Sequence, residues 1–224
     1  MTNSVFTIIL IFFILNVGLL SKWLSYLFQE NSKELSFPAE LGYSWLARAV
    51  KILLLSIPVW LAAACTAISA AGSSAGIPAG EALFFAIYTV FLLTMLCSDI
   101  EQQIIFDKQL ALFAIFGLLH SLLFSLPWEQ HLLAALAGGL SFLLLAILTR
   151  GGIGGGDIKL IAALGLWLGG EALKLTALGG IMIGGLWALC AILVKKKKRT
   201  DFIPYAPAFI IAAFAVYILQ ASHS

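Results

Sequence analysis

The chain has 224 residues, of which 62% are hydrophobic and 11% are charged, and its formal net charge is +2. So few charged residues could not cover the surface of a soluble fold of this length, so lipid is the expected solvent for most of the chain. The basic residues are spread over short segments with one cluster at 195–199. Such a cluster beside an apolar run is typical of a topology signal and does not indicate nucleic-acid binding.

Apolar runs recur along the whole chain. A helix that crosses the bilayer needs roughly 20 residues, and seven runs approach that length: 5–20, 49–71, 83–97, 110–126, 132–148, 172–194 and 202–219. An eighth run, 158–168, is shorter. The first run has no basic residues before it and no small-residue cleavage site after it, so we expect a retained helix. The fold class predicted is all-α, a polytopic bundle of about eight spans forming one membrane domain over 1–224.

Topology favours a crossing by the short run as well. If all eight runs cross, every Lys and Arg except Lys174 lies on one side of the membrane, which the positive-inside rule makes the cytoplasmic side. Without that crossing, the cluster at 195–199 would lie opposite Lys108 and Arg150. Residues 21–45, the longest polar stretch, are then a cytoplasmic loop with room for an interfacial helix.

Three aspartates at the membrane edge are the informative polar residues, because an ionised Asp in hydrocarbon costs about 2.5–3.5 kcal/mol. Asp99 follows the run 83–97, Asp107 comes eight residues later, and Asp157 heads the short run. In the eight-span arrangement all three share the cytoplasmic face. Two carboxyl groups about 3 Å apart cannot both ionise, so Asp99 and Asp157 could act as acid and base on a water molecule.

Structural explanations compete at each of these positions. Asp157 could cap a helix, and Asp99 with Asp107 could belong to a solvated loop. Lys159 could extend its charge to the interface, and the glycines at 151–156 could serve positive φ, close peptide approach or helix packing. From the residues alone, an ion-coupled transporter using Asp157 at a broken helix is an equal alternative.

The string G-G-G-D-I-K-L at 154–160 resembles the G-x-G-D-x-K-L signature of prepilin peptidases, in the GxGD class of intramembrane aspartyl proteases. Residues 99–107 resemble that family's second signature, D-x-x-x-x-x-I-P-D, with Phe106 in place of Pro. Residues 203–207, I-P-Y-A-P, give a third match, and the similarity covers about 83–224, the expected peptidase core.

The resemblance implies catalytic roles for Asp99 and Asp157. It makes Asp107 the second, non-catalytic acid of its motif and adds Gly154, Gly156 and Lys159 as supporting motif residues. It implies an endopeptidase that cleaves the leader of a type IV prepilin or pseudopilin, a membrane-anchored substrate of pilus or type II secretion systems. The site would lie at the cytoplasmic side of the bacterial inner membrane.

The N-terminal region departs from that family. Fuller members carry paired C-x-x-C motifs that bind zinc and are linked to methyl transfer, whereas residues 21–45 contain no cysteine. Cys65, Cys97 and Cys190 stand singly, so we expect no metal, no other cofactor and no methyltransferase activity. A non-catalytic assembly partner of a pilus or secretion system remains a further alternative.

Overall fold

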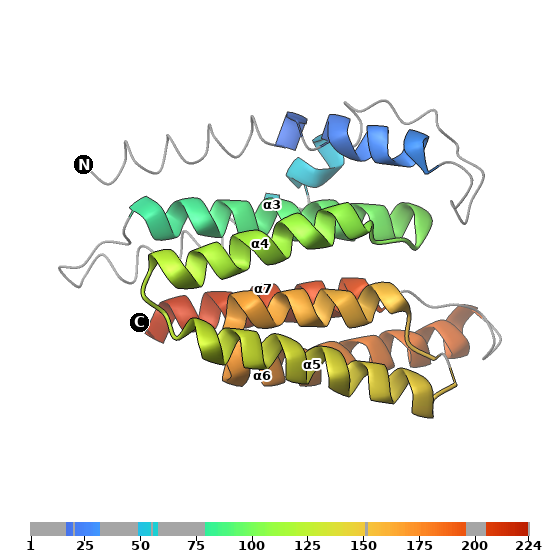
Figure 1. Cartoon of the computed structure of the whole chain (residues 1–224). Coiled ribbons are helices and arrows are strands. Elements are labelled where there is room, and N and C mark those ends of the chain that lie inside the picture. Colours follow the sequence, from blue (N-terminus) through green and yellow to red (C-terminus); the bar gives the residue numbers. More distant parts are fainter. Residues whose placement is uncertain are drawn as a thin grey trace. The chain divides into compact units, whose positions relative to one another are not determined.

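The structure is a computed structural model that describes residues 17–19, 21–31, 49–54, 56–57, 79–150, 152–195 and 205–223. These residues form helices and turns, with no strand among them, so the predicted all-α class is confirmed. The long helices are α3 (Ala79–Gln102), α4 (Asp107–Leu123), α5 (Trp128–Leu148), α6 (Gly155–Lys195) and α7 (Ala206–His223) (Figure 1). Most of the predicted spans 5–20 and 49–71 lies outside the described residues.

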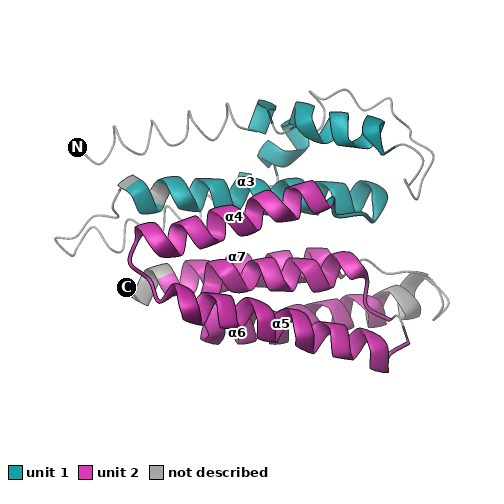
Figure 2. Cartoon of the chain, viewed as in Figure 1, with its two compact units in different colours: residues 1–106, 221–224 teal, residues 107–220 magenta. Residues whose placement is uncertain are grey.

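The chain divides into two compact units (Figure 2). The first unit comprises Met1–Phe106 and Ala221–Ser224, and the second comprises Asp107–Gln220. The boundary falls within the segment 83–224 that the sequence assigns to a peptidase core. In the first unit, residues 21–30 are helical, which fits the interfacial helix allowed for the loop 21–45.

Helices long and apolar enough to cross a bilayer occur in both units. In the described part of the chain they are Leu83–Gln102 of α3, α5 and Gly155–Cys190 of α6, with Ala206–Gln220 as a shorter apolar helix. Large apolar side chains on α5 are exposed, among them Leu133, Leu136, Leu140 and Leu144. Exposed leucines in this number suit a lipid-facing helix. These helices fit a membrane bundle, while the count of eight crossings stays a prediction.

The chain reverses direction inside α6, at Gly169. This residue has φ 71° and ψ −177°, a backbone conformation essentially confined to glycine. A Cβ built on Gly138 of α5 would lie 2.7 Å from Leu173 Cδ2 and 3.2 Å from Ile161 Cγ2, so those two atoms are at most about 6 Å apart. On one straight helix, residues 161 and 173 would be roughly 18 Å apart. Residues 155–168 and 170–195 are therefore two helices that double back, as the separate runs 158–168 and 172–194 predicted (Figure 1).

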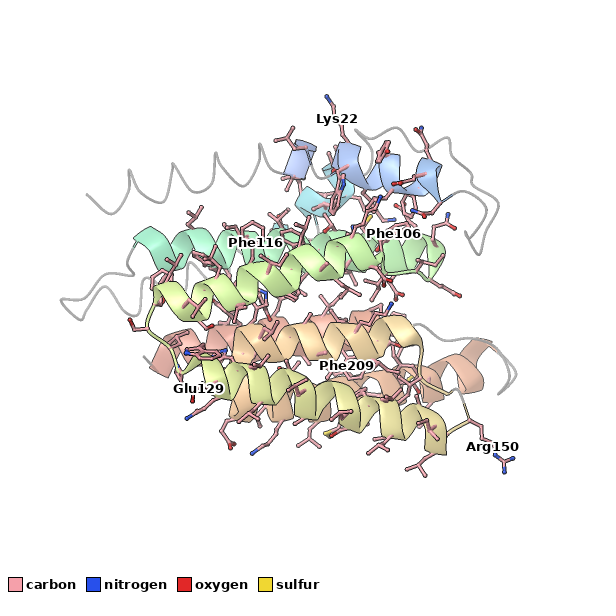
Figure 3. All side chains as sticks on the ribbon, in the orientation of Figure 1. Lys22, Phe106, Phe116, Glu129, Arg150 and Phe209 are labelled. Carbon is pink, nitrogen blue, oxygen red and sulfur yellow. The ribbon has the colours of Figure 1, made fainter. Side chains whose placement is uncertain are left out.

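Small residues set the packing within the second unit. A Cβ on Gly165 would lie 2.5 Å from the backbone nitrogen of Ala135, so the first half of α6 (residues 155–168) packs backbone to backbone against α5. The second half (residues 170–195) runs antiparallel to α7, because Gly180 meets Phe209 and Gly184 meets Tyr205. Phe209, labelled in Figure 3, also packs edge-on against Phe142 of α5 with ring centroids 5.3 Å apart.

Candidate active site

Asp157 lies in the first turn of α6 and is 7% exposed. The residues that follow it at helical spacing, Leu160, Ile161 and Leu164, are all fully buried, so Asp157 heads the inward stripe of this helix. Its backbone nitrogen donates to the Gly154 oxygen at 3.1 Å, and its carboxylate accepts a hydrogen bond from the Gly154 backbone. Asp157 therefore helps to start the helix, and it does so as a buried carboxyl group.

The described glycines before Asp157, at 152 and 154–156, do not adopt a positive φ. Among the described glycines, only Gly169 has a positive φ. A Cβ built on Gly155 would meet no atom within 4 Å, so open space adjoins the backbone two residues before Asp157. Of the roles open to the glycines at 151–156, positive φ is therefore not used at the described positions 152 and 154–156. The expectation of room beside the Asp157 segment agrees with the open space.

Lys159 and Asp107 form an ion pair within the second unit. Lys159 Nζ lies 2.6 Å from Asp107 Oδ1, with side chains 55% and 74% exposed. Asp107 is the first residue of α4 and Lys159 is the fifth residue of α6, so two of the sequence motifs meet at one end of this unit. Both members of this ion pair are therefore largely exposed to solvent.

Asp99 lies in the first unit, in the last turn of α3, and is 6% exposed. Burial in a helix does not fit the solvated loop that the sequence left open for this residue. Glu101 of the same turn pairs with Lys51 at 3.1 Å. Asp99 and Asp157 belong to different units, so the convergence of the two carboxyl groups stays a prediction.

Phe106 fills a defined position in the first unit. It is labelled in Figure 3 and is 7% exposed. Its ring packs edge-on against Phe28 of the helix at 21–30, with ring centroids 5.4 Å apart. Where the prepilin peptidase signature has proline, this chain therefore has an aromatic anchor.

An apolar groove of about 410 Å³ runs between α4, α5 and α6 of the second unit. On α6 its lining residues are Lys159, Ala162, Ala163 and Leu166, a stripe that continues the Lys159 face of the helix. Residues two positions apart on a helix, such as Asp157 and Lys159, point in directions about 200° apart around the helix axis. The Lys159 stripe therefore points away from the Asp157 stripe. Asp157 therefore does not line this groove.

Sequence reasoning missed the residues that hold this site in place. Trp167 Nε1 donates to the backbone oxygen of Phe113 at 2.8 Å, and the indole stacks on the Phe113 ring with centroids 5.3 Å apart. His131 Nδ1 donates to the Leu166 oxygen at 2.9 Å and so satisfies a carbonyl near the end of the first half of α6. No sequence motif marks either contact, because each contact depends on which helices become neighbours.

The described residues contain no group of three or more His, Cys, Asp or Glu side chains that could hold a metal ion. What the geometry does provide is a buried aspartate at a helix start in the second unit, and a buried aspartate at a helix end in the first. Both come from a chain of membrane-length helices.

Residues 86–189 match the type IV leader peptidase family. The matched segment includes Asp99, Asp107, Asp157 and Lys159, so it spans both aspartate motifs. The resemblance to this family that the two motifs indicate is thereby confirmed.

Several curated relatives share the name prepilin leader peptidase/N-methyltransferase. The one from Bacillus subtilis (strain 168) is 34% identical over 150 residues, which cover 65% of this chain and 60% of that protein. The one from Aeromonas salmonicida (strain A449) is 32% identical over 136 residues, 56% of this chain and 45% of that protein. The one from Neisseria gonorrhoeae is 31% identical over 137 residues, 58% and 46% of the two chains.

The chain thus spans about half to three fifths of the length of these relatives. No solved structure gives a significant match.

Proposed function

We propose that this chain is an intramembrane aspartyl endopeptidase that cleaves the leader of a type IV prepilin or pseudopilin. The observation that carries the proposal is Asp157, a buried carboxyl group at the head of α6 within the G-x-G-D-x-K-L string. That string lies in the segment that matches the leader peptidase family. The relatives are named prepilin leader peptidase/N-methyltransferase, and that name supports the same substrate class.

The proposed chemistry needs two carboxyl groups and one water molecule. One aspartate of the pair Asp99 and Asp157 keeps its proton, because two close carboxylates repel each other. The ionised partner takes a proton from water while the water oxygen attacks the scissile carbonyl carbon. The protonated partner then supplies a proton to the leaving amine as the C–N bond breaks. No metal or other cofactor takes part in this scheme.

The chain connection supports a meeting of the two aspartates. Asp107 of α4 pairs with Lys159, and Lys159 lies two residues after Asp157 on α6. Asp99 precedes Asp107 by eight residues, and a fully extended chain of that length would span roughly 26–29 Å. Residues 99–102 are helical, so the tether is shorter than this limit.

The membrane boundary is the proposed place of cleavage. The apolar helices account for an integral membrane position, and the distribution of basic residues favours the cytoplasmic face of the bacterial inner membrane for both motifs. The substrate would then present its leader to the cytosol while its hydrophobic helix stays in the bilayer. Methyl transfer is not part of the proposal, because residues 21–45 lack the cysteines linked to it.

The test is cleavage of a type IV prepilin in membranes that contain Asp99→Asn or Asp157→Asn. Asparagine keeps the size of the side chain but cannot ionise or transfer a proton as a carboxyl group does, so each variant should lose cleavage altogether. Glu171→Gln is the matched control, since Glu171 is a highly exposed carboxylate on the same α6. Full cleavage by either Asn variant would rule out the dyad and reopen the transporter and assembly-partner alternatives.

A further inference from the structure

Gln109 is a buried polar residue whose side chain has no hydrogen-bond partner among the residues described. It lies in the first turn of α4 and is 0% exposed. Both its Nε2 and its Oε1 lack a partner there. Burying an amide without hydrogen bonds destabilises a folded protein, so such a group calls for an explanation.

The side chain of Gln109 lies on the face of α4 that turns towards α6. Phe113 and His120 follow Gln109 at i+4 and i+11, and therefore share its face. The rings of both residues stack on Trp167, with centroids 5.3 Å and 5.5 Å from the indole. Gly117 lies at the edge of the same face, and a Cβ there would lie 2.6 Å from Trp167. Gln109 thus continues a stripe of α4 that packs on α6.

Two contacts fix the level of Gln109 relative to Asp157. The ion pair joins Asp107 to Lys159, and the indole hydrogen bond joins Phe113 to Trp167, so α4 runs parallel to the first half of α6. Gln109 lies two residues further into α4 than Asp107, and Asp157 lies two residues before Lys159. At 1.5 Å per residue, the ion pair places Gln109 roughly 6 Å further along the bundle than Asp157, and the indole hydrogen bond places it roughly 9 Å further.

We propose that Gln109 holds the backbone of the substrate next to the scissile bond. A primary amide offers one acceptor oxygen and an NH₂ donor, which match the N–H and C=O of an extended peptide. Here Nε2 would donate to a substrate carbonyl and Oε1 would accept from a substrate N–H. The inference rests on the proposed function, because the peptide is the one that Asp157 would cleave.

A substrate-binding amide and an ordinary structural amide at position 109 predict different results for Gln109→Leu. If the partners of Gln109 belong to the substrate, replacing it with leucine removes a buried group without a partner and should leave folding intact. The unfolding temperature of Gln109→Leu in detergent should then equal that of the parent or exceed it. Its kcat/KM for prepilin cleavage should fall roughly thirtyfold, the change expected for loss of two substrate hydrogen bonds.

Thr176→Val is the matched control. Thr176 is also fully buried, its hydroxyl also has no hydrogen-bond partner among the residues described, and it lies in the second half of α6, beyond the reversal at Gly169. This variant should cleave prepilin at the parent rate. If both variants lose cleavage to the same degree, the effect is one of packing and the inference is overturned.

Three further outcomes decide between the two proposals. If Asp157→Asn is inactive and Gln109→Leu cleaves like the parent, the role of Gln109 is wrong while the proposed function stands. If Asp157→Asn cleaves normally, the proposed function fails, and the Gln109 assignment fails with it. If Gln109→Leu has a lowered unfolding temperature, the amide has a partner within the protein, which also overturns the inference.

Discussion

The indole nitrogen of Trp167 donates its hydrogen bond to the backbone oxygen of Phe113, 2.8 Å away on a different helix. Phe113 lies in the interior of α4, where backbone carbonyls accept the hydrogen bonds of the helix itself. The Phe113 oxygen therefore accepts the bond from Trp167 as a second bond, through its other lone pair. Gly117 leaves the space that the indole occupies. This contact holds α4 against the first half of α6, which carries Asp157 in its first turn.

Trp167→Phe should therefore destabilise the second unit by roughly 1–2 kcal/mol, through loss of the N–H donor and of buried ring area. Thermal unfolding in detergent measures the change. Trp187→Phe is the control, because Trp187 on the second half of α6 is 62% exposed and should tolerate the substitution. Equal destabilisation by the two variants would contradict the role assigned to Trp167.

Gly169→Ala should destabilise the protein by about 1–3 kcal/mol, because a side chain at φ 71° and ψ −177° is strained. The added Cβ would also lie 3.3 Å from His131 Nε2. Gly170→Ala provides the adjacent comparison, since a Cβ there would meet no atom within 4 Å. Unfolding temperatures that place Gly169→Ala level with Gly170→Ala would mean that the reversal does not depend on this conformation.

Lys159→Ala should change the unfolding free energy by less than about 1 kcal/mol, because the ion pair with Asp107 is largely exposed. The matched comparison is Lys174→Ala, which removes the exposed pair with Glu171 on the same helix. Denaturation at low and high salt should show that both effects weaken as salt is added. A much larger loss for Lys159→Ala would mean that this pair is shielded from solvent.

The amino-acid sequence by itself determined the solvent and the class of this protein. A composition with so few charges requires lipid around most of the chain, and runs of membrane length require helices, because a backbone in lipid must satisfy its own hydrogen bonds. The break between the runs 158–168 and 172–194 also followed from the sequence, because the distribution of basic residues favoured a separate crossing by the short run. The two aspartate motifs indicated the similarity to the leader peptidase family because they are local strings.

Only the tertiary structure decided which side chains meet. Asp107 and Lys159 are 52 residues apart, and their pairing depends on α4 running parallel to the first half of α6. The partners of Trp167 and His131, and the buried amide of Gln109, depend on the same arrangement of helices. Apolar periodicity shows that a helix buries a face, but many faces are apolar in a chain like this one. The neighbour of each face is fixed by packing between distant segments, which no local pattern records.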